Sequence, residues 1–365
     1  MKITYTDIYR FTIPMMPFAI ATGTMDSAQN VFIRVFTDEG IFGVGECSAF
    51  PVITGETQDT CLVMAKEFAR ILKDKDPQDI AGCMDSLHMF TAHNSTIKSA
   101  FDMALYDISA KAQAVPLYQM LGGVKRDVET DITIGISDAD FMVYLAKEFV
   151  SKGANILKVK LGKDVKEDVD RIAKIRYAVG EKIEIRIDAN QGWNFEQAKE
   201  ALNALSSFNI EFCEQPMRSW YDDYLPALIK ASPIKIMADE SCFNHHDARK
   251  LIINKSCDAI NIKLSKAGGI LEALEIYKTA NTVHIPCMVG GMLESRIALS
   301  AKLHFAYACK DINYFDLDTF MLGHLKDPCV GGLKYQGYHL DIDDTPGIGA
   351  DADEAFLSTC EKFTV

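Results

Sequence analysis

The feature that most constrains the fold of this chain is a series of charged residues at nearly constant spacing, each at or just past the end of a short apolar run. Five of them follow one another at intervals of 28, 26, 25 and 24 residues: Lys160, Asp188, Glu214, Asp239 and Lys263. Glu294 and Asp316 continue the series after two further runs. Each interval has room for one strand, one helix and two loops, so the spacing predicts repeated βα units.

Eight strands follow from these runs, and the segments between them carry helical periodicity. The predicted strands span residues 130–136, 155–160, 183–189, 210–214, 234–239, 259–264, 284–289 and 313–317. With seven helical crossovers they predict the fold class α/β, a (β/α)7β TIM-like barrel expected at residues 123–322. Charged groups at the C-terminal ends of barrel strands converge on one open face, and burying them is costly unless they bind something. The series therefore predicts an active site at that face.

An α+β capping domain is expected before the barrel, at residues 1–122. Its predicted elements are strands at 3–13, 30–37 and 41–46, followed by helices within 58–121. The segment 14–27, rich in small residues, is expected to be a loop. Glycine and proline become frequent after residue 322. Residues 323–365 are therefore expected to fold back onto the capping domain and complete it.

Composition limits the partners and the compartment of this protein. A net charge of −13 argues against nucleic acid and anionic membranes as partners, because both require a basic face. The ten cysteines form no Cys-x-x-Cys pair, which indicates free thiols and a reducing compartment. The N-terminal segment lacks the apolar core of a signal peptide, and no run approaches membrane-spanning length. We therefore expect a cytoplasmic protein that acts on a small molecule, and leave open whether it forms a homo-oligomer.

Three acids of the series, Asp188, Glu214 and Asp239, come from consecutive strands and are expected to lie close together. Carboxylates at short range repel one another unless a hard divalent cation neutralises them. Oxygen-only ligation, completed by water or substrate, suits Mg²⁺. The sequence therefore predicts one Mg²⁺ site, whose ligands are Asp188, Glu214 and Asp239.

Two lysines flank the acids in sequence, on opposite sides of the predicted barrel mouth. Lys160 and Lys263 can act as bases only if their pKa values are lowered, which burial, the cation and the neighbouring Lys158 are expected to achieve. One lysine would remove a proton next to a carboxylate, the cation and Lys158 would stabilise the enolate, and the other lysine would return a proton to the opposite face. Lys266 lies past the strand, so Lys263 is preferred as the base. The predicted reaction is a 1,1-proton transfer, that is, racemisation or epimerisation.

Five motifs, taken in order, resemble the muconate-lactonising subgroup of the enolase superfamily. They are Lys158-Val-Lys160, Asp188-Ala-Asn-Gln, Glu214-Gln-Pro216, Ala238-Asp-Glu-Ser241 and Lys263-Leu-Ser-Lys-Ala-Gly-Gly269. The resemblance covers essentially the whole chain, including the capping domain. On the last barrel strand, Asp316-Leu-Asp318 resembles the Asp-x-Asp signature of dipeptide epimerases. Two carboxylates opposite the metal can hold the free α-ammonium of a dipeptide while the metal holds its C-terminal carboxylate.

The resemblance implies an epimerase that inverts the α-carbon of the C-terminal residue of a dipeptide. The substrate-binding residues that it implies are Thr133, Lys158, Gly291, Leu293, Asp316 and Asp318. It also implies that Glu294 supports the Lys263 side of the site.

The default substrate implied by the resemblance is L-Ala-D/L-Glu, a peptidoglycan fragment, which would place the enzyme in murein-peptide recycling. Epimerases of that specificity place a basic residue in the capping loop, whereas residues 11–33 contain no Lys or Arg. The corresponding specificity loop offers Thr22, Gly23 and Thr24, and residues 50–57 are expected to form the other wall. A dipeptide with a small or apolar second residue is therefore the nearest variant.

Two other classes of function stay open at this point. Cycloisomerases and dehydrating lyases use the same machinery, as in the o-succinylbenzoate synthase and N-succinylamino acid racemase types, but their substrates have no ammonium. A barrel that only binds a ligand is disfavoured, because both lysines and all three acids are present.

Overall fold

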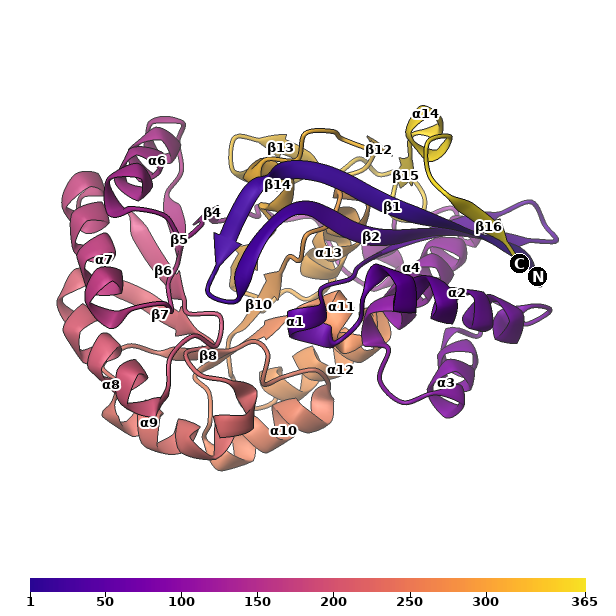
Figure 1. The fold of residues 1–365 in the computed structure, drawn as a ribbon. Coiled ribbons are helices and arrows are strands. Elements are labelled where there is room, and N and C mark those ends of the chain that lie inside the picture. Colours follow the sequence, from indigo (N-terminus) through magenta and orange to yellow (C-terminus); the bar gives the residue numbers. More distant parts are fainter.

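Eight parallel strands form a barrel in the computed structural model, which describes residues 1–365 (Figure 1). In chain order they are β4 Ile132–Ile134, β5 Ile156–Lys160, β6 Glu184–Asp188, β7 Ile210–Glu214, β8 Ile236–Ala238, β9 Ala259–Ile262, β10 Cys287–Gly290 and β11 Tyr314–Asp316. Each strand pairs with its neighbours in the chain. At the seam between the first and last strands, the amide of Asp131 donates to the carbonyl of Phe315 at 3.1 Å. The predicted (β/α)7β fold class is confirmed.

Seven helices connect these strands and cover the outside of the barrel (Figure 1). They are α6 Ala139–Ser151, α7 Val165–Val179, α8 Phe195–Ala204, α9 Leu225–Ala231, α10 His245–Asn254, α12 Ile270–Asn281 and α13 Arg296–Ala308. Five begin after a residue whose side chain accepts a hydrogen bond from a first-turn amide: Asp138, Asp164, Asn194, Asn244 and Ser295. Side-chain alternation along the strands then separates two environments. Leu157 and Val159 join the apolar core, whereas Lys158 and Lys160 contact carboxylates inside the barrel.

The capping domain combines an antiparallel sheet with helices packed on it. Its elements are β1 Ile3–Ile20, β2 Gly23–Thr37, β3 Phe42–Ser48, α1 Pro51–Thr54, α2 Gln58–Leu72, α3 Ile80–Phe90, α4 Ser95–Ala112 and α5 Leu117–Met120. Helix α4 lies directly against β3, where a Cβ on Gly45 would come within 1.9 Å of the carbonyl oxygen of Ala100. Only glycine allows this approach. A second, smaller apolar core fills the space between the sheet and these helices.

The expected loop at residues 14–27 is wrong. Strands β1 and β2 continue through this segment as a two-stranded arm that extends over the barrel mouth (Figure 1). Pro14 and Pro17 hid the strand pattern, because proline removes a ladder donor. The register shifts between Pro14 and Phe18, as in a β-bulge, and pairing then resumes. The amide of Ile136, just past β4, donates to the carbonyl of Ala19 at 2.8 Å and so attaches the arm to the barrel.

The C-terminal segment returns to the capping sheet. Its strand β16, Lys362–Thr364, pairs antiparallel with β1, and Thr364 lies opposite Asp7 (Figure 1). The remaining short elements are α11 Leu264–Ala267, α14 Glu354–Leu357, β12 Cys329–Gly331, β13 Lys334–Gln336, β14 His339–Asp341, β15 Ala350–Ala352 and 3-10 turns at Leu205–Phe208, Ser219–Tyr224 and Thr319–Leu322. The domain boundaries at residues 122 and 322 stay predictions. No helix combines the length and the apolar composition needed to cross a membrane.

One buried carboxylate ties the two domains together next to the barrel mouth. Glu46, on β3, accepts hydrogen bonds from the amide and hydroxyl of Ser295 at 2.9 and 2.6 Å. These groups lie at the N-terminus of α13, where a carboxylate is favoured by the helix dipole. Asn30 on β2 donates both to Glu46, at 2.6 Å, and to the carbonyl of Leu293, at 2.9 Å. The loop before α13 is therefore fixed by the capping domain.

Candidate active site

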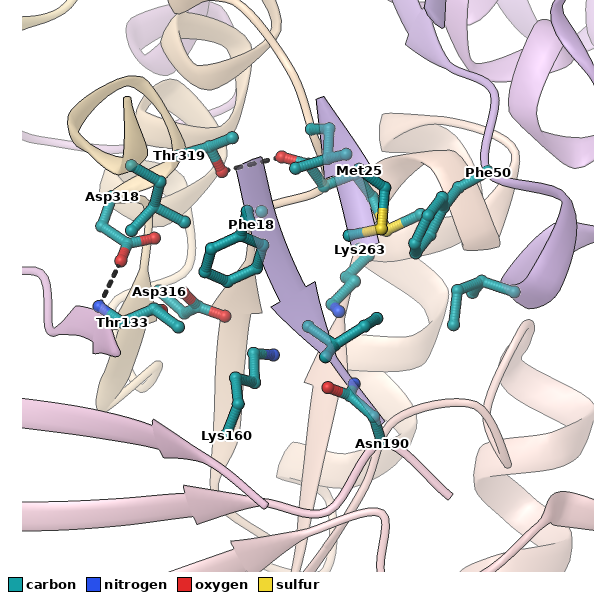
Figure 2. A pocket seen from close by; sticks show the side chains of 16 residues that line it. Phe18, Met25, Phe50, Thr133, Lys160, Asn190, Lys263, Asp316, Asp318 and Thr319 are labelled. Atoms are coloured by element: carbon teal, nitrogen blue, oxygen red, sulfur yellow. Dashed lines mark hydrogen bonds between the residues drawn. The ribbon is translucent and has the colours of Figure 1, made fainter. Parts of the chain in front are cut away.

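A cavity with an empty volume of ≈ 520 Å³ lies between the open face of the barrel and the arm (Figure 2). The barrel side contributes polar residues: Thr133, Lys160, Asn190, Lys263, Asp316, Asp318 and Thr319. The arm, α1 and two loops contribute Phe18, Ile20, Met25, Phe50, Ile53, Gly291, Met292, Leu293 and Leu322. The cavity thus has a charged floor and an apolar roof.

Strand register positions the charged residues of the floor. Lys160 lies opposite Asp188 in the β5–β6 pair, and Asp188 lies opposite Glu214 in the β6–β7 pair. Asp239 directly follows β8, and Lys263 directly follows β9. All three carboxylates are fully buried. The structure brings these predicted site residues together at the strand ends, while their roles as ligands and acid/base groups stay predictions.

Each cavity lysine forms an ion pair with one of the three acids. The Nζ of Lys160 lies 2.6 Å from Asp188 Oδ2, and the Nζ of Lys263 lies 2.8 Å from Asp239 Oδ2. Lys266, on α11, is also buried, and its Nζ lies 2.6 Å from the other oxygen of Asp239. Lys266 does not line the cavity, so it contacts Asp239 from the side away from the cavity. Lys263 does line the cavity.

Lys158 lies one layer deeper, fully buried inside the barrel. Its Nζ lies 2.7 Å from Glu214, 2.6 Å from Asp316 and 3.5 Å from Asp188. Burial alone would lower the pKa of Lys158, but the carboxylates of Asp316, Glu214 and Asp188 outweigh it and raise the pKa well above its usual value. The carboxylates around Lys158 therefore favour its protonated form.

The buried charged groups of the floor shift one another's pKa values. Burial and the adjacent Asp188 raise the pKa of Glu214 to about 7, although Lys158 opposes the shift. Burial also lowers the pKa of Lys263, but Asp239 and Glu214 outweigh this, and the net shift is upward. The lowered pKa expected for Lys160 and Lys263 depends on a bound cation as well as on burial and Lys158, so it stays a prediction.

The donor chemistry of the floor fits a hard divalent cation. Asp188, Glu214 and Asp239 present oxygen atoms only, from three adjacent strand ends, which is the ligand type that Mg²⁺ prefers. Next to them, both side-chain oxygens of Glu240 are buried without a hydrogen-bond partner. Burial and the charge of Asp239 raise the pKa of Glu240 to about 8. This excess of buried carboxylate over available donors is relieved if a cation binds here.

A second carboxylate cluster lies at the seam of the barrel and was only partly anticipated. Asp131, Asp316 and Asp318 place one oxygen each within 4.8 Å of one another, and all three are buried. Arg186 already pairs with Asp131, at 2.9 Å, and Lys158 pairs with Asp316. Asp316 and Asp318 line the cavity, whereas Asp131 lies behind them. With part of its charge already neutralised by side-chain cations, this cluster suits an ammonium group better than a divalent metal.

The other predicted substrate-binding residues occupy the rim of the cavity. Thr133 lines it and its amide donates to Asp318 at 2.6 Å, which fixes that carboxylate (Figure 2). Gly291 and Leu293 also line it. Glu294 forms a buried ion pair with Lys302 on α13 and accepts a hydrogen bond at 3.1 Å from Ser265, on the short helix α11 that follows Lys263. Its predicted support of the Lys263 side stays a prediction. The Nζ of Lys302 also donates to the carbonyl of Gly290 at 2.9 Å.

The predicted specificity loop does not line the cavity. Thr22, Gly23 and Thr24 form the tip of the arm and are not among the residues that line the cavity. The lining side chains of the arm are Phe18, Ile20 and Met25. These residues were missed because the segment was predicted to be a loop. Only in a strand do side chains alternate between two faces, so only a strand prediction could have shown which of them face the cavity. On the other wall, Phe50 and Ile53 do line the cavity, within the predicted segment 50–57.

Family descriptions cover both domains. Residues 5–122 match the "Mandelate racemase / muconate lactonizing enzyme, N-terminal domain", and residues 142–356 match "Enolase C-terminal domain-like". Among curated relatives, a D-Ala-D/L-Ala epimerase from Cytophaga hutchinsonii is 40% identical and covers 100% of both chains. An L-Ala-D/L-Glu epimerase from Clostridium acetobutylicum is 35% identical over 94% of this chain and 96% of its own length. A hydrophobic dipeptide epimerase from Enterococcus faecalis is 37% identical over 91% and 94%.

Solved structures show the same similarity in three dimensions. The dipeptide epimerase of Cytophaga hutchinsonii, complexed with Mg and the dipeptide D-Ala-L-Val, superposes with a TM-score of 0.98 at 40% identity and covers 100% of both chains. The N-succinyl Arg/Lys racemase of Bacillus cereus superposes with a TM-score of 0.97 at 32% identity, again over 100% of both chains. The capping arm and the barrel are therefore shared with enzymes of known chemistry.

Proposed function

The chain belongs to the mandelate racemase/muconate-lactonising family of the enolase superfamily, and from this premise we propose that it is a Mg²⁺-dependent dipeptide epimerase. The enzyme inverts the α-carbon of the C-terminal residue by 1,1-proton transfer. Three curated relatives that are 35–40% identical to this chain carry epimerase names, which supports this activity over cycloisomerisation or dehydration.

The observation that carries the proposal is the position of two lysines around the barrel. Lys160 ends β5 and Lys263 follows β9, so three strands separate them in either direction around the eight-stranded barrel. They therefore approach the cavity from opposite sides, and Figure 2 shows both side chains directed into it. A substrate α-carbon held between them can lose its proton to one lysine, and the planar enolate that forms can gain a proton from the other lysine on the opposite face.

The acid/base cycle needs one neutral and one protonated lysine. In one direction, neutral Lys160 accepts the proton from the α-carbon while protonated Lys263 donates its own to the opposite face; the reverse reaction exchanges the roles. Lys158, as a buried cation, stabilises negative charge that develops on the substrate carboxylate. Asp188, Glu214 and Asp239 would hold Mg²⁺. When bound, Mg²⁺ neutralises the substrate carboxylate and so makes the adjacent C–H bond more acidic.

Asp316 and Asp318 distinguish a dipeptide from the substrates of the alternative reactions. Both carboxylates line the cavity at the end where Thr133 lies, and they favour a cationic group (Figure 2). A free α-ammonium meets this requirement, whereas an N-succinyl group brings a second carboxylate toward two acids. This geometry therefore supports a dipeptide over an N-succinylamino acid.

The proposed substrates are L-Ala-Xaa dipeptides, a class that includes L-Ala-D/L-Glu, a murein-peptide fragment. Relatives named for L-Ala-D/L-Glu and for hydrophobic dipeptides both exist. We place the enzyme in the cytoplasm, in line with ten free cysteines. Self-association into a homo-oligomer is compatible with the fold but is not needed to build the cavity.

The direct test is incubation of the enzyme and Mg²⁺ with a panel of L-Ala-L-Xaa dipeptides, followed by chiral separation. Appearance of the L-Ala-D-Xaa epimer supports the proposal. If every dipeptide is returned unchanged while an N-succinylamino acid is racemised, the enzyme is an N-succinylamino acid racemase instead.

A further inference from the structure

Resting on the proposed epimerase function, we infer that the enzyme selects dipeptides whose C-terminal residue has an uncharged, apolar side chain, and that Met25, Phe50 and Ile53 form the surface that selects it. This surface lies in the part of the cavity that faces away from the ammonium site. It favours an apolar residue over glutamate, a preference that the proton transfer itself does not set.

The two ends of the cavity differ in chemistry. Asp316, Asp318 and Thr133 lie together at one end, whereas Met25 and Phe50 lie at the other, with Lys160 and Lys263 between them (Figure 2). A dipeptide bound through its ammonium at the acidic end and with its α-carbon between the lysines directs its C-terminal side chain toward the roof. That side chain therefore faces the sulfur of Met25 and the ring of Phe50.

No cation is available on this wall. The only basic residues that line the cavity are Lys160 and Lys263, and each is already paired with a carboxylate. The single charged residue in the arm between Phe18 and Gln29 is Asp26, which is exposed and has the wrong sign for a glutamate side chain. A γ-carboxylate in this position would lose its hydration without gaining a counter-ion, which is strongly unfavourable.

Two uncharged polar side chains nearby already donate hydrogen bonds to other groups. The hydroxyl of Thr319 donates to the carbonyl of Met292 at 2.7 Å, and the amide group of Asn190 donates to Asp188 at 3.2 Å. Thr22 and Thr24, the other candidates for holding a carboxylate, do not line the cavity. An apolar side chain needs none of these partners, and its burial against the wall is favourable.

The test compares three side chains of similar length on the wild-type enzyme with Mg²⁺: L-Ala-L-Met, L-Ala-L-Gln and L-Ala-L-Glu. We expect kcat/KM for L-Ala-L-Met to exceed that for L-Ala-L-Glu by at least about tenfold, with L-Ala-L-Gln between them. Equal or faster turnover of L-Ala-L-Glu would overturn the inference while leaving the epimerase function intact. Failure to epimerise any of the three, or L-Ala-L-Val, would instead defeat the proposed function itself.

A pair of variants locates the selecting surface. Met25→Arg places a cation on the apolar wall and should raise the L-Ala-L-Glu to L-Ala-L-Met ratio of kcat/KM by at least about tenfold. Met16→Arg is the matched control, because Met16 lies on the same arm, is 57% exposed and does not line the cavity. It adds the same charge and should leave the ratio unchanged. If both variants shift the ratio equally, or if Met25→Arg leaves it unchanged, the assignment of the wall is wrong.

Discussion

The ammonium of Lys158 lies 2.6 Å from the carboxylate of Asp316, across the inside of the barrel from β5 to β11. Because the same Nζ also lies 2.7 Å from Glu214, Lys158 is a counter-ion shared by the two carboxylate clusters. Groups that share a buried counter-ion are coupled, so a change of charge in one cluster alters the other. The candidate cation site and the candidate ammonium site are therefore parts of one electrostatic unit.

Replacing this shared counter-ion should destabilise the fold. Lys158→Met keeps most of the side-chain volume but leaves Asp316 and Glu214 buried without their cation. In Mg²⁺-free buffer at neutral pH, we expect the free energy of unfolding to fall by about 3–5 kcal/mol, as measured by urea denaturation. Lys174→Met is the control, since Lys174 pairs with Asp170 at the surface, and it should cost less than about 1 kcal/mol. Equal losses in the two variants would show that Lys158 is not a structural cation.

Loss of charge at the ammonium site should affect only substrates with a free amine. Asp316→Asn should lower kcat/KM for the preferred dipeptide by about 100-fold or more, because the ammonium loses a buried charged partner. The wild-type enzyme should process the N-acetylated form of the same dipeptide poorly, and the variant should be no worse than wild type on that form. If Asp316→Asn lowers turnover of both forms by the same factor, Asp316 acts on the fold or on catalysis rather than on the ammonium.

The strand ends of the candidate site could be predicted from the sequence because a charged residue after an apolar run can hardly lie elsewhere in a βα repeat. Strand β7 was predicted at its observed bounds, Ile210–Glu214. Asp131 could not be found in this way, because it precedes β4 and meets Asp316 only through closure of the barrel. That closure joins parts of the chain 185 residues apart (316 − 131). No local pattern reports such a contact.

Mg²⁺ binding can be assigned to one of the two carboxylate clusters by calorimetry. Glu214→Gln should abolish or strongly weaken the heat of Mg²⁺ binding, whereas Asp131→Asn should leave it close to that of wild type. Both changes replace one buried carboxylate by an amide of similar size, so each is the control for the other. Retained binding in Glu214→Gln together with lost binding in Asp131→Asn would move the metal to the seam cluster. Removal of Mg²⁺ by a chelator should abolish turnover, and added Mg²⁺ should restore it.

A buried aspartate at the domain contact should make stability depend on pH. Burial raises the pKa of Asp102 to about 7 from an ordinary value of 3.8, although amide donors at Ile270 and Leu271 oppose the shift. Between these values the folded chain holds a proton that the unfolded chain has released. The contribution of Asp102 to the free energy of unfolding is therefore complete below about pH 4. It is lost as the pH rises through about 7, by at most about 1.4 kcal/mol per pH unit.

Asp102→Asn keeps an acceptor for the amide of Ile270 but cannot titrate. Its free energy of unfolding should fall less than that of the wild type between about pH 5 and 8, as measured by urea denaturation at each pH. Asp79→Asn, at the exposed N-terminus of α3, should retain the wild-type slope. Identical slopes in the wild type and Asp102→Asn would show that Asp102 is not the source of the pH dependence.

The cavity-facing residues of the arm could not be predicted from the sequence. Its prolines break the alternation on which strand prediction depends, and pairing resumes only because the partner strand holds the register after the bulge. Which of its side chains face the cavity is decided by that register. The tip residues Thr22 to Thr24 were therefore proposed, whereas Phe18 and Met25, opposite each other in the ladder, line the cavity. The sequence shows that the segment is apolar, but not which of its side chains face the cavity.

If Lys160 and Lys263 serve opposite faces of one enolate, each lysine exchanges the α-proton of one epimer with solvent. Proton NMR in D₂O with Mg²⁺ should show deuterium entering the α-position of the C-terminal residue of an L-Ala-L-Xaa dipeptide as the D-epimer appears. Lys160→Ala and Lys263→Ala should each abolish epimerisation, while one variant still exchanges the α-proton of the L-epimer and the other that of the D-epimer. Full epimerisation by either variant, or inversion without deuterium incorporation in the wild type, would contradict the two-lysine mechanism.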